Sequence, residues 1–187
     1  MTREEAQAII DAARALEETP DLSGANLRYA NLANMDMDEC NLSGADFTGA
    51  WMKGASIQDA DLTSAILESV RAKEVDFGGT DMTGAKLNGG NFDSGDFVDT
   101  VMVNIEAEEA SFKDAVISGT LTDLTGANLN RAICIGADFT NAPLTNANLR
   151  DAKLMNADFT GADFSGATFN GANFRGATTP FLQTIDR

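Results

Sequence analysis

The segment from Ala157 to Gly176 reads ADFTG, ADFSG, ATFNG and ANFRG, four five-residue units in succession without a slip. Each unit has a small residue, a polar residue, a large apolar residue and then two residues that are mostly small or polar. Self-similarity at a fixed short period is typical of a solenoid, in which each repeat packs only against its neighbours. This segment therefore decides the architecture that we expect for the whole chain.

The same unit can be followed through most of the 187 residues. With the large apolar residue taken as the centre, twenty units run in steps of five from Leu22 to Ile117, and eleven more from Leu124 to Phe174. Three centres are not Leu, Phe, Met or Ile: Ala72, Ala107 and Cys134. We expect one repeat domain over residues 20–177.

A period of five fits neither an amphipathic helix, which repeats every 3.6 residues, nor a strand, which repeats every two. It fits a chain that turns a corner every five residues. The centre and the small residue of each unit then point inward, and the other three residues face outward. The core is expected to be a column of apolar side chains with no cavity for a substrate.

The unit resembles the A(D/N)LXX consensus of the pentapeptide-repeat family, and the resemblance extends from about Pro20 to Gly176. In that family four units make one coil of square cross-section, and the coils stack through backbone hydrogen bonds. The resemblance implies an all-β solenoid, a right-handed quadrilateral β-helix of about eight coils for this number of units.

Four units per coil would place every twentieth residue in one column. The centres then align as apolar columns, one of which contains Met37, Ile57, Phe77, Phe97 and Ile117. A small centre is offset by a larger neighbour, since Val70 precedes Ala72 and Ile105 precedes Ala107, as close packing requires. The centres predicted to define the core are Leu62, Phe77, Phe97, Phe139 and Phe159.

Residues 1–19 are expected to form an N-terminal capping helix. Thr2 and Glu5 have the spacing of a capping box, and apolar residues recur at helical spacing from Ala6 to Leu16. A helix over about residues 3–18 would cover the apolar end of the first coil. The alternative is a helix that docks a partner.

Two irregularities interrupt the repeat. The centres Ile117 and Leu124 are seven residues apart, which predicts a two-residue insertion near 120–121, at Thr120-Leu121. The surrounding section 98–124 departs most from the consensus. It is interpreted as a tolerated irregularity or, alternatively, as a feature that faces a partner, because loops on regular scaffolds carry function. Residues 178–187 are expected to form a C-terminal cap or tail.

The residue before each centre is expected to point outward, in one of four columns. Two adjoining columns are rich in aspartate, and the formal net charge is −16. Asp and Asn at such corners bond locally to the backbone, but that role does not require a charge, and stacked like charges repel. The candidate acidic surface for a partner comprises Asp61, Asp81, Asp123, Asp163, Asp76, Asp96, Asp138 and Asp158.

Residues that could carry chemistry are scarce. There is no histidine, the commonest general base and a frequent metal ligand. Cys40 and Cys134 fall several coils apart in different columns, too far for a disulfide, and are interpreted as core residues. Stacked aspartates could bind calcium weakly, but a solvated acidic face is preferred. No catalytic residue, cofactor or metal site is expected, and hence no enzyme.

Charge and hydropathy restrict the partners. Direct binding to nucleic acid is disfavoured, because the phosphates and the protein would repel each other. No membrane span or secretory signal is recognised, so a cytoplasmic protein is expected. Trp51 is an outward residue that could anchor a partner. Alternatively, it packs against Arg71 one coil above through a cation–π contact.

These features predict a non-enzymatic interaction or scaffold module that presents an acidic, rod-like surface to a protein partner with a basic surface. Some pentapeptide-repeat proteins resemble a DNA duplex and bind type II topoisomerases such as DNA gyrase. The resemblance therefore implies an alternative, a DNA-mimic regulator or inhibitor of gyrase with a quinolone-resistance-like role. A homodimer through the C-terminal end is a further expectation, if Phe181, Leu182 and Ile185 leave the last coil uncovered.

Overall fold

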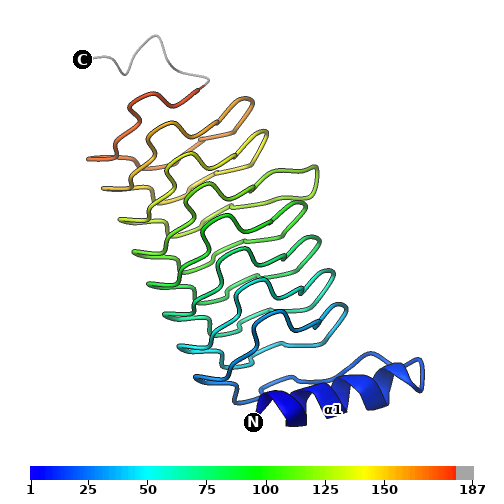
Figure 1. The fold of residues 1–187 in the computed structure, drawn as a ribbon. Coiled ribbons are helices and arrows are strands. Elements are labelled where there is room, and N and C mark those ends of the chain that lie inside the picture. The colour runs from blue at the N-terminus through cyan, green and yellow to red at the C-terminus, as the bar shows by residue number, and fades with distance from the viewer. Residues whose placement is uncertain (180–187) are drawn as a thin grey trace.

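The computed structural model describes residues 1–179 of the chain. One helix, α1 (Arg3–Arg14), lies beneath a stack of coils that rises along a single axis (Figure 1). Within the described residues α1 is the only helix, and the coils are joined by single parallel β-bridges rather than by long strands. The fold is a right-handed quadrilateral β-helix with an N-terminal helical cap.

The β-bridges confirm four units per coil. From Asp21↔Asn41 to Asp96↔Val116, each bridge joins residues twenty positions apart. Parallel strands of neighbouring layers lie about 4.8 Å apart, so residues twenty positions apart form the columns that the sequence predicted. The outward side chains of one column are consequently stacked at the spacing of the backbone layers.

One unit illustrates how five residues complete a corner. The Leu62 N–H donates to the Asp81 carbonyl of the next coil at 2.7 Å, and the Ala65 N–H donates back to the Leu62 carbonyl at 3.0 Å. Ser64, within this turn, has a φ of 58°, the sign that a type II turn requires at its third position. Its own N–H donates to the Thr83 carbonyl of the coil above at 2.9 Å.

The centres and the small residues form one continuous core along the axis. Leu62, Phe77, Phe97, Phe139 and Phe159 are all fully buried. Aromatic centres stack from coil to coil, as for Phe139 and Phe159, whose ring centroids lie 4.9 Å apart with the planes 7° from parallel. The units with alanine centres are packed as well, because Val70 and Ile105 are buried beside them.

The register of the bridges changes once. Asp81 pairs with Val101, twenty positions on, but Val101 pairs with Asp123, twenty-two positions on. The spacing returns to twenty at Asn128↔Asn148. The two additional residues lie within the segment 118–122, whose corner projects beyond the neighbouring corners (Figure 1).

Helix α1 begins with the capping box, since the Thr2 hydroxyl accepts from the Glu5 N–H and the Glu5 carboxylate accepts from the Thr2 N–H. It ends at Arg14, earlier than the predicted residue 18. Glu17 has a φ of 58°, and the Glu18 N–H donates to the Ala13 carbonyl at 3.0 Å, the pattern of a Schellman motif. This motif usually has glycine at the left-handed position. Because the chain has Glu17 there, the sequence did not indicate that the helix ends at this point.

Candidate interaction surface

The four sides of the coil divide into two halves of very different charge. We call one half the acidic sector; it contains the units with the candidate aspartates and the corners that follow them. Its residues are 20–24, 35–44, 55–64, 75–84, 95–104, 115–126, 137–146, 157–166 and 177–179. The opposite sector consists of the intervening ten-residue stretches from 25–34 to 167–176.

The acidic sector contains fourteen carboxylates and no lysine or arginine. The opposite sector contains ten lysines and arginines and nine carboxylates, so it is close to neutral. Nearly all of the net charge of the repeat is therefore on two adjoining sides of the rod. Four acidic residues at corners of this sector were not among the candidates, although reading corner positions at the same twenty-residue spacing would have found them: Asp38, Glu39, Asp59 and Asp99.

Each of the eight candidate aspartates has the same local geometry. Its Oδ1 accepts a hydrogen bond from the backbone N–H two residues later, for example from Thr63 to Asp61 at 2.9 Å and from Val98 to Asp96 at 2.9 Å. The same bond is made at the other six: Asp81, Asp76, Asp123, Asp138, Asp158 and Asp163. One carboxylate oxygen thus supports the corner while the group remains at the surface.

Asparagine makes the same bond where it occupies the same position. The Ser43 N–H donates to Asn41 Oδ1 at 3.1 Å, and the Asp93 N–H donates to Asn91 Oδ1 at 3.0 Å. The corner therefore needs a side-chain carbonyl oxygen but no charge. The corner bond therefore does not explain why the acidic sector has aspartate rather than asparagine, and we attribute this choice to a property of the surface.

Hydrogen bonds lower the pKa of two of these carboxyl groups, Asp158 and Asp163. The Thr160 hydroxyl donates to Asp158 at 2.6 Å and, together with the Thr160 N–H, lowers the pKa of that carboxyl. Ser165 does the same for Asp163, again with its hydroxyl as the larger cause of the lowered pKa. Donors that bond to a carboxylate favour its charged form, so these groups contribute full negative charge at neutral pH.

The aspartate columns are interrupted midway along the rod. Val101 stands between Asp81 and Asp123 in one column, and Val116 stands between Asp96 and Asp138 in the other. Both valines belong to the coil that carries the inserted segment 118–122. The acidic sector is therefore divided into two acidic stretches by an apolar level.

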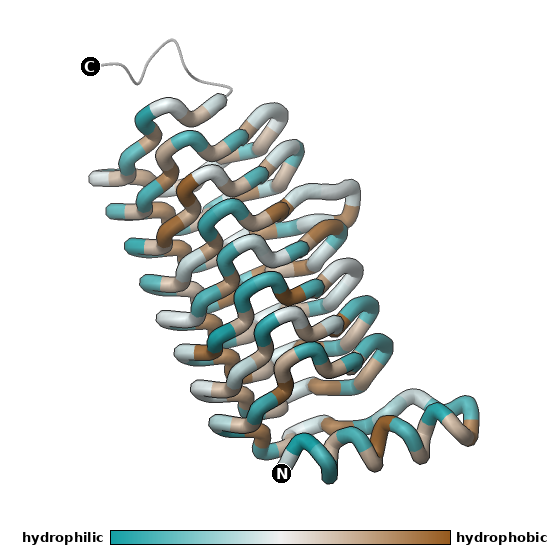
Figure 2. The backbone as a smooth tube through the Cα atoms, in the orientation of Figure 1, coloured by the Kyte–Doolittle hydropathy of each residue, from teal (hydrophilic) through white to brown (hydrophobic). Residues whose placement is uncertain are grey.

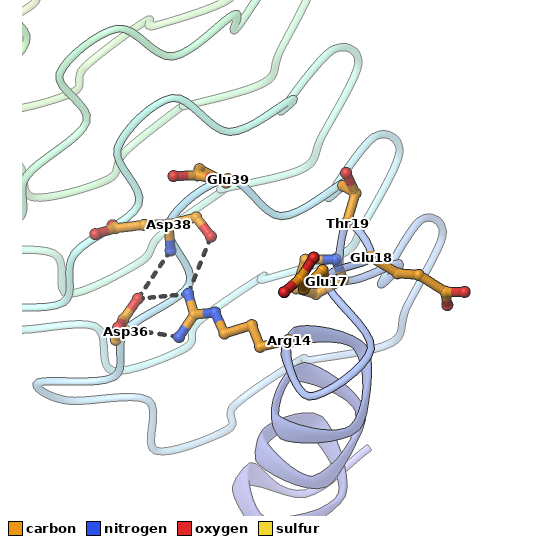
Figure 3. Close-up of a pocket in the computed structure, with 8 residues that line it drawn as sticks. Arg14, Glu17, Glu18, Thr19, Asp36, Asp38 and Glu39 are labelled. Atoms are coloured by element: carbon orange, nitrogen blue, oxygen red, sulfur yellow. Dashed lines mark hydrogen bonds and ion pairs between the residues drawn. The ribbon is translucent and has the colours of Figure 1, made fainter.

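A cavity of about 560 Å³ lies where the end of α1 meets the first coil (Figure 3). Arg14 crosses it and donates to both carboxylate oxygens of Asp36 at 2.8 and 3.0 Å and to the Asp38 carbonyl at 3.0 Å. The hydrogen bond from Arg14 is the main cause of the lowered pKa of Asp36. A carboxylate held ionised in this way anchors the helix and is poorly suited to be a general acid.

Trp51 lies on the opposite sector and has about half of its surface exposed (49%). Arg71 occupies the same column one coil above, as expected. Within residues 1–179, however, the cation–π contact is made by Arg28 over the ring of Tyr29, at 5.5 Å. Tyr29 is itself 73% exposed. The candidate anchor is thus separate from the acidic surface.

Both cysteine thiols are buried in the core as free cysteines. Burial raises the pKa of Cys40 to about 11 and that of Cys134 to about 12.

Within residues 1–179, no group of three or more potential ligands is placed to hold a metal ion, and no helix is long and apolar enough to cross a membrane. The tail residues Phe181, Leu182 and Ile185, on which the expected dimer depended, lie outside the described residues.

Comparison with known proteins identifies the family. The model of the family described as pentapeptide repeats matches eight copies over residues 21–59, 55–93, 122–161 and 143–178. The chain belongs to the pentapeptide-repeat family. The matches leave residues 94–121 uncovered, which includes most of the section that departs from the consensus. No curated protein sequence matches the chain.

Several solved structures are similar to this chain. A trypsin-treated variant of QnrB1, a plasmid-mediated fluoroquinolone resistance protein, has a TM-score of 0.67 at 14% identity, with 87% of this chain and 92% of that chain covered. HetL, a pentapeptide repeat protein involved in heterocyst differentiation regulation in the cyanobacterium Nostoc, is 27% identical, with a TM-score of 0.29 and coverage of 86% and 85%. A pentapeptide repeat protein from the Arabidopsis thaliana thylakoid lumen is 31% identical, with a TM-score of 0.40 and coverage of 66% and 68%. The match to QnrB1 supports the fold.

Proposed function

We propose that this protein is a non-enzymatic interaction module whose acidic sector binds a protein partner with a basic surface. The observation that carries the proposal is the charge division of the repeat. One half contains fourteen carboxylates and no lysine or arginine of its own, with Arg14 of α1 paired to Asp36 at its end, and the opposite half is nearly neutral. Complementary potentials steer association and set specificity. The bonding of Asn at equivalent corners supports a role for the charge itself, because the fold would accept Asn there.

The same features favour binding over catalysis. Side chains fill the axis of the coil, from Leu62 to Phe159, whereas substrate sites are usually concave and largely enclosed. The carboxylates whose pKa is shifted are held in the charged form by local hydrogen bonds. A regular, outward-facing set of such charges suits a broad protein contact.

Affinity capture from a lysate of the native host tests the proposal. The bait variant Asp61→Asn, Asp76→Asn, Asp81→Asn and Asp96→Asn keeps the corner bonds and removes four charges of the acidic sector. The matched control, Glu68→Gln, Glu74→Gln, Glu106→Gln and Asp151→Asn, removes four charges of the opposite sector. We expect the partner captured by the wild type and by the control to be lost from the acidic-sector variant. Equal capture by all three baits would refute the acidic sector as the contact.

A second candidate function is regulation or inhibition of a type II topoisomerase such as DNA gyrase by imitation of DNA. The observation that favours it is the regular stacking of negative charges along a narrow rod, because a basic groove that binds phosphates recognises such a pattern. QnrB1, which shares the fold, is a fluoroquinolone resistance protein. A gyrase supercoiling assay at two salt concentrations tests this candidate, and absence of any effect at micromolar protein would remove it.

A further inference from the structure

An apolar patch lies within the acidic sector, at the level where both aspartate columns are interrupted. Leu121 is 66% exposed and Val116, in the same coil, is 37% exposed. Val98, in the coil below, is partly exposed and lines the same cavity as Leu121. The corner that carries Leu121 is the one that projects from the stack, and apolar residues are visible along it (Figure 2). An exposed apolar patch with a polar rim is a feature of interaction sites.

The inserted segment is held in place by its own hydrogen bonds. The Leu121 N–H donates to Asp99 Oδ1 at 2.9 Å, which ties the segment to the coil below. The Thr122 hydroxyl donates to the Ser118 carbonyl at 2.7 Å and closes the loop on itself. The Leu121 side chain is thus presented outward from a constrained backbone, so a partner would lose little entropy in ordering it.

A cavity of about 410 Å³ lies next to Leu121 along the same corner. Gly78 lines it where the adjacent coils have Gln58 and Val98, and Gly79 lies next to it. Val98 and Leu121 supply its apolar wall. Four carboxylates also line it: Asp59, Asp76, Asp96 and Asp99. The cavity therefore combines an apolar wall with a strongly negative rim, in a sector that contains no cation of its own.

We infer that this patch and its cavity receive a large apolar side chain from a partner segment whose flanking residues are lysine or arginine. The apolar side chain would pack against Leu121 and Val98, and the flanking cations would pair with the carboxylates on either side of the apolar level. Charge complementarity selects this occupant, since an acidic or uncharged apolar segment would leave these carboxylates unpaired. The inference rests on the proposed function and adds a position and a side-chain requirement to it.

Two synthetic peptides test the inference in a fluorescence polarisation assay. They have equal length and equal lysine content, and one has leucine at its centre where the other has serine. We expect the leucine peptide to bind the wild type about tenfold more tightly, which corresponds to about 1.4 kcal/mol. In Leu121→Ser this preference should disappear while the affinity for the serine peptide stays unchanged. Val116→Thr, which keeps the β-branched shape, should reduce the preference in the same direction.

Leu16→Ser is the matched control, because Leu16 is 69% exposed, close to the value for Leu121, but lies beyond the end of α1. It should keep the tenfold preference. Equal binding of both peptides to the wild type would overturn the apolar site, and so would an unchanged preference in Leu121→Ser. Neither result would contradict the acidic sector as a contact for basic segments. If neither peptide binds, the result would overturn the inference together with the proposed contact for basic segments.

Discussion

The corners of the coil contain residues with positive φ. The type of residue at this position determines how much backbone strain the corner has. Glycine adopts this conformation without strain, and Asn or Asp tolerates it. Asn141 (φ 59°) and Gly161 (φ 74°) occupy equivalent corners of successive coils. Several corners instead have glutamate, including Glu39 (φ 59°) and Glu109 (φ 59°). These glutamates are departures from the local preference of the backbone.

We predict that Glu39→Gly stabilises the protein. A residue with a side chain loses about 1–2 kcal/mol when it adopts the left-handed conformation, and glycine at position 39 would not have this strain. The greater conformational freedom of glycine in the unfolded chain offsets part of the gain. The expected net increase in the free energy of unfolding is about 0.5–1 kcal/mol, measured by urea denaturation. Glu39→Gln controls for the lost charge. A gain of equal size in Glu39→Gln would mean that electrostatics rather than backbone strain is responsible.

The two cysteines should be unreactive in the folded protein. Burial raises the pKa of Cys40 to about 11 and that of Cys134 to about 12, so little thiolate is present at pH 8, and the thiolate is the reactive form. We expect alkylation by iodoacetamide to be slow at both positions and to become fast in denaturant. Mass spectrometry of labelled peptides measures this, and rapid labelling of Cys134 in the native protein would contradict its position in the core.

Among the elements, α1 differs from the coils because it covers the end of the stack with one narrow face. Ala6 and Ile10 are fully buried against the first coil, whereas Ile9 is 36% exposed. The helix is anchored at both ends, by the Arg3 guanidinium on the Ala33 carbonyl at 2.7 Å and by Arg14 on Asp36. The apolar layer that a solenoid would otherwise expose is thus covered by the chain itself.

The adjacent isoleucines of α1 provide a direct test of this orientation. Ile10→Ala should destabilise the protein by about 2–5 kcal/mol, the range for a large buried aliphatic residue changed to alanine. Ile9→Ala, with the same chemical change on the exposed face, should have a much smaller effect. Thermal and urea unfolding of the two variants measure the difference. Similar losses at both positions would contradict the packing of α1 described here.

At the scale of the whole molecule, the division of charge has an energetic cost. Stacked carboxylates such as Asp61 and Asp81, or Asp76 and Asp96, occupy bridged positions in successive coils. Unit charges about 4–5 Å apart in water repel each other by roughly 1 kcal/mol. A sector without cations cannot neutralise this repulsion internally, whereas a basic partner or added salt can.

We therefore predict that replacing Asp61, Asp76, Asp81 and Asp96 by Asn raises the melting temperature at low salt, because the corner bonds are kept and the repulsion is removed. The gain should shrink at about 1 M salt, where the screening length falls to about 3 Å. The control with Glu68, Glu74, Glu106 and Asp151 neutralised should gain less, since that sector contains cations that offset its acids. Scanning calorimetry in both salts measures the effect. A lower melting temperature for the acidic-sector variant would contradict the proposed repulsion.

Some features of the structure did not follow from the repeat. The end of α1 depended on Glu17, a residue type with no strong preference for the left-handed conformation it adopts. The cation–π contact is made by Arg28 and Tyr29 rather than by Trp51 and Arg71. The repeat places these residues in columns but does not determine their side-chain rotamers. The cavity beside Leu121 is lined by residues of four successive coils, and no single five-residue unit has a sequence pattern that predicts it.

The sequence by itself determined the solenoid, the inward positions and the aspartate columns. It could do so because the repeat has a five-residue period and four units per coil. The residue number therefore gives the side of the coil and the layer in which each residue lies. The spacing of the centres also located the inserted corner. Only the tertiary structure decided how that corner is closed by hydrogen bonds, where the helix ends and how far the Leu121 side chain is exposed. These outcomes depend on backbone hydrogen bonds and packing between residues about twenty positions apart, which act together only once the coils have stacked.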